Sequence, residues 1–190
     1  MAERRFCVVD VAPMHAEPDG SSEQVTQALR GEPLAVGERT AGGWARVTTA
    51  YDYSGWIAED ALSAEPLGEW LPAVRDGDPV DEARALLGAP YLWGGISERG
   101  IDCSGLVHVA WRRLGRLVPR DAHQQAATGE PVAEPEYGDL AVYGAESVTH
   151  IAFWLGDGRI LHAAGGREVV EEEEPGSLQE IRRGFVRLRR

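Results

Sequence analysis

The first candidate for chemistry is a cysteine that opens a predicted helix. Cys103 follows a turn-rich stretch, residues 91–95, and the apolar residues after it recur at helical spacing, at Leu106, Val107, Ala110, Trp111 and Leu114. A thiol at a helix N-terminus faces unpaired N–H groups and the positive end of the helix dipole, and both favour the thiolate. We therefore expect Cys103 to have a low pKa and to act as a nucleophile. The other cysteine, Cys7, lies in an apolar run and is predicted to be a buried strand residue.

Two histidines are the candidate bases, because a thiol nucleophile needs one group to take its proton and another to hold that base. His150 and His162 flank a predicted hairpin with a glycine-rich tip. A three-residue loop pairs Leu155 with Arg159. In that register Ala152 pairs with His162, and His150 becomes the diagonal neighbour of His162 on the same face, roughly 7–8 Å away at Cα. A two-residue loop would put the imidazoles on opposite faces, so the arrangement requires the longer turn.

The amino-acid composition and the residue spacing argue against several other kinds of functional site. The chain has no Asn and no Lys, which excludes a Cys-His-Asn triad and leaves His, Asp, Glu or Gln to orient the base. The formal charge is −12, and nucleic-acid binding is disfavoured because phosphate contacts need a cationic face. No metal-site spacing and no G-x-S-x-G motif occurs, so we expect no metal, no cofactor and no serine nucleophile. His108 is interpreted as a residue on a helix flank and His15 as a loop residue, and His123 falls in a motif that could line the cleft.

The cellular setting follows from two further patterns. No apolar stretch reaches the ~18 residues that a membrane span requires, so no membrane association is expected. No signal peptide is visible, and if residue 1 is the native start, a cytoplasmic protein with reduced thiols is expected. Two cysteines in 190 residues make no disulfide framework, although a Cys7–Cys103 pair is arithmetically possible. Nothing in the sequence indicates an obligate protein partner.

The chain is predicted to divide at a linker, residues 66–78. Residues 1–65 contain short apolar runs between glycines, which is typical of a small all-β barrel; the runs are 7–11, 25–29, 34–36, 44–48 and 55–57. After the linker, Asp78 as N-cap and Pro79 at the first helical position start a helix. This helix opens the second domain, residues 79–190.

Five motifs in order resemble the NlpC-type (NlpC/P60) family of bacterial cell-wall cysteine peptidases. They cover most of residues 80–190, and they are Tyr91-Leu92-Trp93-Gly94-Gly95, Asp102-Cys103-Ser104-Gly105, Pro119-Arg120-Asp121-Ala122-His123-Gln124-Gln125, Gly138-Asp139-Leu140, and Thr149-His150-Ile151 followed by Leu161-His162. The resemblance implies an α+β fold, a papain-like peptidase core preceded by the small barrel. It implies Cys103 as nucleophile, His150 as general base and His162 as the residue that orients the base.

The first domain is similar to a bacterial SH3-like domain, through residues 27–32, 43–47 and 53–57. Relatives with this domain order are γ-D-glutamyl-L-diamino-acid endopeptidases, so the resemblance implies cleavage of murein peptides with a free N-terminal L-Ala, in cell-wall recycling. It also implies five substrate-binding residues. Tyr53 and Asp102 match positions that hold the substrate amine, Asp121 stands where some relatives carry a substrate-binding Ser, and the other two are Ser104 and Tyr91.

Other functions remain open from the sequence. The same Cys-His-His site could serve a cell-wall-targeted murein hydrolase, an acyltransferase or an amidase. An inactive module could keep the fold for peptide capture, although the presence of Cys103, His150 and His162 disfavours it. The barrel could target the wall, form part of the substrate site or only pack.

Overall fold

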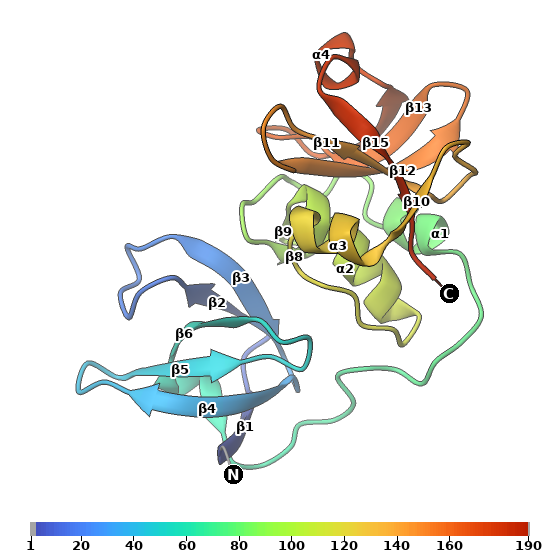
Figure 1. Cartoon of the computed structure of the whole chain (residues 1–190). Coiled ribbons are helices and arrows are strands. Elements are labelled where there is room, and N and C mark those ends of the chain that lie inside the picture. Colours follow the sequence, from blue (N-terminus) through green and yellow to red (C-terminus); the bar gives the residue numbers. More distant parts are fainter. Residues whose placement is uncertain (1–2, 190) are drawn as a thin grey trace. The chain divides into compact units, whose positions relative to one another are not determined.

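The computed structural model describes residues 3–189 and consists of two compact units, which divide between Pro72 and Ala73 (Figure 1). Residues 1, 2 and 190, which belong to the predicted domains, lie outside the described residues.

The predicted linker, residues 66–78, contains the division. Its first part packs on the N-terminal unit, because a Cβ on Gly31 would lie only 2.6 Å from the carbonyl oxygen of Leu67. Its last part joins the C-terminal unit, where the N–H of Arg75 donates to the carbonyl of Leu114 at 3.2 Å. Each end of the linker is therefore held by its own unit.

The N-terminal unit is an antiparallel sheet of seven strands with the order β3-β2-β6-β5-β4-β1-β7. Its apolar core is formed by alternate residues of the strands, among them Met14, Leu34 and Ile57, which are fully buried. The elements are β1 (Glu3–Cys7), β2 (Val11–His15), β3 (Gln24–Leu29), β4 (Pro33–Arg39), β5 (Trp44–Thr48), β6 (Ser54–Ala58), η1 (Glu59–Ala61) and β7 (Leu62–Ser63).

The predicted strands of this unit are confirmed except at its start. The run 44–48 is strand β5 with the predicted bounds. The run 7–11 is wrong as a single strand, because β1 ends at Cys7 and β2 begins at Val11. Between them the chain turns, with Val9 40% exposed and the carbonyl of Asp10 accepting from Arg30. Cys7 itself is buried at the end of β1, as predicted.

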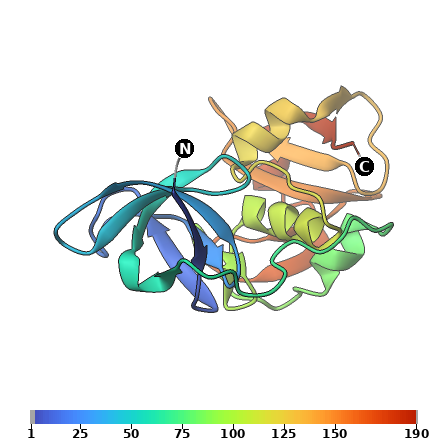
Figure 2. The same cartoon turned by 90° about the horizontal axis from the view of Figure 1, so that it is seen from below.

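The C-terminal unit is an α+β domain whose main sheet has six strands in the order β10-β15-β11-β12-β13-β14. Helices α1, α2 and α3 lie on one side of this sheet in Figure 1, and Figure 2 shows α2 between α1 and α3. The elements are α1 (Pro79–Arg84), β8 (Ile96–Ser97), β9 (Gly100–Ile101), α2 (Cys103–Arg113), α3 (Ala122–Thr128), β10 (Glu130–Val132), β11 (Leu140–Tyr143), β12 (His150–Gly156), β13 (Arg159–Ala163), β14 (Val169–Glu173), α4 (Gly176–Gln179) and β15 (Arg182–Arg187).

Helix α2 is central to this domain. Every residue from Cys103 to Trp111 is buried, and the helix packs against β12 and β13. The helix predicted after the linker is present as α1, with Asp78 accepting from the N–H of Val80 at 2.9 Å and Pro79 in the first turn. The sheet and α2 thus bring the cysteine motif against the two histidine strands.

Two features are absent from the described residues. No helix among them is long and apolar enough to cross a membrane. Within residues 3–189, no group of three or more His, Cys, Asp or Glu side chains is arranged to hold a metal ion.

Candidate active site

Cys103 is the first residue of α2, as the helical spacing predicted. The preceding residue, Asp102, is the N-cap and accepts from the N–H of Gly105 at 2.7 Å. The loop before the helix runs very close to it, because a Cβ on Gly105 would lie 2.1 Å from the carbonyl oxygen of Gly95. Only glycine allows this approach, so the D-C-S-G motif fixes the position of the thiol.

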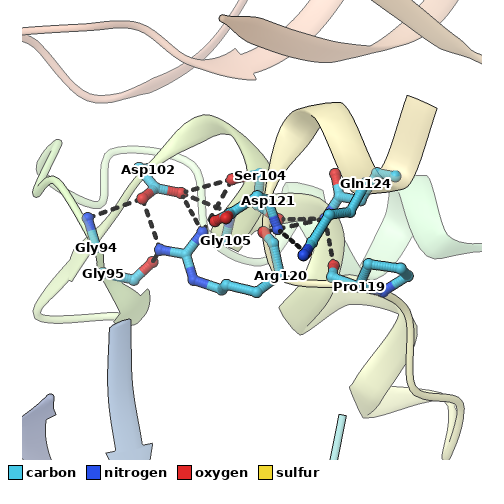
Figure 3. A network of polar contacts seen from close by, with 10 residues as sticks. Gly94, Gly95, Asp102, Ser104, Gly105, Pro119, Arg120, Asp121 and Gln124 are labelled. Carbon is cyan, nitrogen blue, oxygen red and sulfur yellow. Dashed lines mark hydrogen bonds and ion pairs between the residues drawn. The ribbon is translucent and has the colours of Figure 1, made fainter. Parts of the chain in front are cut away.

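A buried ion pair between Arg120 and Asp102 holds the start of this helix in place. Arg120 is 1% exposed, and its two terminal nitrogens donate to the two carboxylate oxygens of Asp102 at 3.0 and 2.6 Å. The same carboxylate accepts from the N–H of Gly94 at 2.8 Å and from the hydroxyl of Ser104 at 3.3 Å (Figure 3). Bidentate pairing fixes both position and orientation of the carboxylate. The network therefore holds the loop and the first turn of α2 as one rigid piece.

The side chains of Asp102 and Ser104 make hydrogen bonds within the protein. Asp102 accepts from five donors, while an ionised carboxylate has about four acceptor sites. The hydroxyl of Ser104 donates to Asp102 and accepts from Arg120 at 2.9 Å. In this arrangement Asp102 has no acceptor position left for a substrate amine, whereas the hydroxyl of Ser104 keeps one lone pair. Their predicted contact with substrate stays a prediction.

His150 and His162 lie on the same face of the sheet, and Nε2 of His150 is 2.8 Å from Nδ1 of His162. The hairpin reaches this arrangement by a different route from the predicted one. The predicted pairing of Leu155 with Arg159 is wrong, because Arg159 pairs with Gly156. The loop is therefore the shorter, two-residue type that was expected to separate the imidazoles.

A register shift between Trp154 and Gly156 explains how the imidazoles share a face although the loop has only two residues. Phe153 pairs with Leu161 and Trp154 with Ile160, which is the register in which residue 152 stands opposite residue 162. One extra residue in the first strand restores the facing that the short loop alone would reverse. The prediction that His150 and His162 lie on the same face is thus correct, but the three-residue loop given as its reason is wrong.

A third side chain extends the histidine pair across the sheet. Nε2 of His162 is 2.8 Å from Oε1 of Glu172, and Arg167 donates to the same oxygen at 2.7 Å. His162 is opposite Val170 in the β13–β14 register, so Glu172 is its diagonal neighbour on the same face. The sequence analysis did not identify Glu172, which is one of four consecutive acidic residues, 171–174, a pattern typical of a solvated surface.

The ionisation of the cysteine differs from the expectation. Burial raises the pKa of Cys103 to about 11, the Asp102 carboxylate adds to the rise, and a hydrogen bond from the backbone of Ile151 opposes it. Burial also lowers the pKa of His150 to about 4, with a further lowering by His162. The predicted low pKa of Cys103 is therefore wrong for the resting site. Between these values the thiol and the imidazole are both neutral.

Three further predicted residues have different settings. Tyr91 is partly buried, and burial, with smaller effects of Cys103 and Asp102, raises its pKa to about 12, so its phenol stays neutral near the site. Asp121 forms a capping box with Gln124 at the start of α3. Tyr53 belongs to the N-terminal unit, where its N–H donates to the side chain of Thr49. Substrate roles for these three residues stay predictions.

The helix-borne cysteine and sheet-borne histidine pair place the C-terminal unit in the papain-like class of cysteine peptidases. Comparison with known proteins gives the particular family. The chain belongs to the NlpC/P60 family, whose profile matches residues 88–184. A second profile, the bacterial dipeptidyl-peptidase Sh3 domain, matches residues 14–62 and identifies the N-terminal unit as an SH3-like barrel.

Individual relatives agree with this assignment. The peptidoglycan endopeptidase RipB of Mycobacterium tuberculosis is 32% identical over 173 residues, covering 74% of this chain and 72% of that protein. A γ-D-glutamyl-L-lysine dipeptidyl-peptidase of Bacillus cereus is 32% identical over 119 residues, covering 58% of this chain. A crystal structure of an NlpC/P60 family protein from Bacillus cereus covers 98% of this chain and 63% of its own, with a TM-score of 0.57 and 23% identity, which supports the fold. The chain spans only 36% of the length of the dipeptidyl-peptidase and 54% of two probable endopeptidases of Corynebacterium glutamicum.

Proposed function

We propose that the protein is a cysteine peptidase that hydrolyses the γ-D-glutamyl–diamino-acid bond of murein peptides. The observation that carries the proposal is the hydrogen-bonded pair His150–His162 on the strands against which the Cys103 helix packs. Such a pair supplies a base and a group that orients it, which is what thiol-based acyl transfer requires. The substrate is inferred from a relative of known name, the γ-D-glutamyl-L-lysine dipeptidyl-peptidase, and from the dipeptidyl-peptidase type of the barrel.

The proposed reaction starts from the neutral pair. As Sγ of Cys103 attacks the γ-carbonyl carbon of D-Glu, its proton passes to His150, so charge forms only while the bond forms. The N–H of Cys103 at the helix start stabilises the oxyanion. His150 then returns the proton to the departing diamino-acid amine, which leaves a thioester on Cys103. Water, deprotonated by His150, hydrolyses this thioester and frees the thiol.

The requirement for a free N-terminal L-Ala is the finer part of the proposal. A substrate site closed around the free amine would favour short peptides and a role in recycling. The five donors around Asp102 mean that it contributes to such a site through the loop it fixes, unless the amine displaces one of them. Tyr53 is the residue on which this part chiefly depends.

A second candidate function is hydrolysis of the intact wall. It is favoured by the likeness to a peptidoglycan endopeptidase over 74% of this chain. In that function the barrel would serve targeting, and the substrate site would be open at both ends.

One experiment separates these functions. The protein is incubated with L-Ala-γ-D-Glu-diaminopimelate, with the same peptide N-acetylated, and with purified sacculi, and the products are identified by mass spectrometry. The recycling function requires cleavage of the free tripeptide and a loss of more than about tenfold, or 1.4 kcal/mol, on acetylation. Equal cleavage of both peptides, or release of fragments from sacculi, would favour the wall hydrolase. Cleavage of none of the three, with Cys103→Ala as the blank, would reject the proposed reaction.

A further inference from the structure

We propose that Glu172 is a positioning residue that decides which nitrogen of each imidazole carries the proton, so that the free lone pair of His150 is on Nδ1. The inference deepens the proposed function and rests on it for its kinetic consequences. It starts from two distances of 2.8 Å, from Nε2 of His150 to Nδ1 of His162, and from Nε2 of His162 to Oε1 of Glu172. These contacts form one continuous chain across β12, β13 and β14.

The direction of this chain follows from its last member. An ionised carboxylate can only accept hydrogen bonds, so Nε2 of His162 must carry its proton and donate it to Glu172. In a neutral imidazole the other nitrogen is then an acceptor, so Nδ1 of His162 accepts from Nε2–H of His150. By the same rule Nδ1 of His150 has the free lone pair. One carboxylate therefore sets the tautomers of two imidazoles.

The surroundings of Glu172 keep it ionised. Burial raises its pKa, but the hydrogen bonds from His162 and Arg167 outweigh this effect, and the net pKa lies below the ordinary value. Arg167 donates to Oε1, the same oxygen that accepts from His162. Oε1 of Glu172 thus contacts both the charged guanidinium of Arg167 and the imidazole of His162. Neighbouring Glu171 instead pairs with Arg84 and Arg159.

The opposite tautomers would disable the proposed base. If Nδ1 of His162 carried the proton, it would donate to Nε2 of His150, and Nδ1 of His150 would be protonated. That nitrogen could no longer accept the proton of Cys103. The other charged or aromatic groups near the pair do not decide between the two states, because Asp102 acts on His150 only through its charge and Tyr143 only through ring contact at 5.7 Å.

Nuclear magnetic resonance tests the direction without any substrate. Long-range ¹H–¹⁵N correlation spectra of the ¹⁵N-labelled protein at neutral pH distinguish a protonated from an unprotonated ring nitrogen, and His150→Gln and His162→Gln assign the signals. We expect Nε2–H on both rings. An Nδ1–H signal from either ring would overturn the proposal, whether or not murein peptides are substrates.

Three variants separate the charge of Glu172 from its hydrogen bond. Glu172→Ala removes both, so the tautomers should mix and kcat should fall by about 10–100-fold, with little change in KM. Glu172→Gln can keep an oxygen in place for His162 and Arg167, so it should retain the wild-type tautomers and most of the activity. Glu173→Gln is the matched control, because Glu173 is the exposed neighbour on the same strand.

The pH profile gives a second readout that a purely structural role would not change. The carboxylate stabilises the imidazolium, so its removal lowers the pKa of the pair. The acid limb of kcat/KM should therefore move to lower pH in Glu172→Gln, by about one unit, and stay in place in Glu173→Gln. Equal acid limbs in the two Gln variants, together with full activity of folded Glu172→Ala, would overturn the proposal.

Alkylation distinguishes failure of this inference from failure of the proposed function. Reaction of Cys103 with iodoacetamide at neutral pH needs the base but no peptide. It should slow by about tenfold in Glu172→Ala and remain at the wild-type rate in Glu173→Gln. If these rates behave as expected while no murein peptide is cleaved, only the substrate assignment is wrong. Equal alkylation rates in the wild type and Glu172→Ala would count against the positioning role.

Discussion

The two cysteines of this chain lie in different units, and burial raises the pKa of each to about 11. Their surroundings differ greatly. The thiol of Cys7 is directed at backbone carbonyl groups of Val9 and Ala28, at 3.3 and 3.7 Å, inside the apolar core of the barrel. Cys103 lies at a helix start, with hydrogen bonds from the backbone of Ser104 and Ile151 and with a histidine pair on the two strands against which the helix packs. The proposed nucleophile thus differs from Cys7 in the groups placed to receive its proton, and the resting pKa does not distinguish the two thiols.

The test with the largest expected effect replaces each of the two cysteines in turn. Cys103→Ala should lower hydrolysis of the tripeptide by at least about 10⁴-fold, since no other group can form the thioester. Cys7→Ala should keep its activity and lose about 1 kcal/mol of stability, because it leaves a small gap in the barrel core. Initial rates and thermal denaturation measure the two effects. Loss of turnover in folded Cys7→Ala would break the comparison.

The next test removes the proton acceptor instead of the thiol. His150→Ala should reduce kcat by about 10³-fold, whereas His162→Gln should lose about 10–100-fold, because orienting a base is a smaller task than being one. Circular dichroism must show that both variants fold. A His150→Ala variant as active as the wild type would exclude His150 from the mechanism.

A third test concerns the Asp102–Arg120 ion pair at the start of the helix that carries Cys103. Arg120→Met should lower the free energy of unfolding by about 3–5 kcal/mol, because it leaves the buried Asp102 carboxylate without its cation. Arg189→Met is the control, since that side chain is 86% exposed and its pair with Glu130 should contribute at most about 1 kcal/mol. Urea denaturation measures both. Equal losses in the two variants would show that the Asp102–Arg120 pair does not hold the site.

The smallest expected effect is the difference in labelling between the two thiols. At neutral pH iodoacetamide should modify Cys103 at least about tenfold faster than Cys7, because His150 can take the proton of Cys103. Both rates should rise with pH, since each pKa of about 11 lies above neutrality. Peptide mapping gives the two rates. In His150→Ala the selectivity should disappear, and faster labelling of Cys7 in the wild type would contradict the assignment of the nucleophile.

The sequence was sufficient for the parts of the molecule that depend on local pattern and motif. The α2 helix and the barrel strand β5 follow from apolar spacing, and the α+β class follows from the family resemblance that the ordered motifs carry. The candidate roles of Cys103, His150 and His162 follow from the same motifs. Cys103 is the first residue of α2 and His150 the first of β12, whereas His162 lies within β13. These features need only residues that are close in the chain.

What the sequence did not predict depends on contacts between distant segments. The pKa of Cys103 is governed by how deeply packing buries it, which helical spacing does not report. Arg120 was part of a recognised motif, but its pairing with Asp102, 18 residues earlier, needs the folded chain. Glu172 had one local signal, since a three-residue loop at residues 165–167 would make it the diagonal neighbour of His162, and the surrounding acidic residues concealed it.

The register shift at Leu155 makes hairpin length a constraint of its own. Substitutions at the tip change one side chain, and the positive φ angles at Gly156, Asp157 and Gly158 restrict which residues are accepted. Deleting one residue there would turn every later side chain of β13 to the other face, and His162 would point away from both His150 and Glu172. An engineer who grafts loops onto this hairpin must therefore count residues before choosing them.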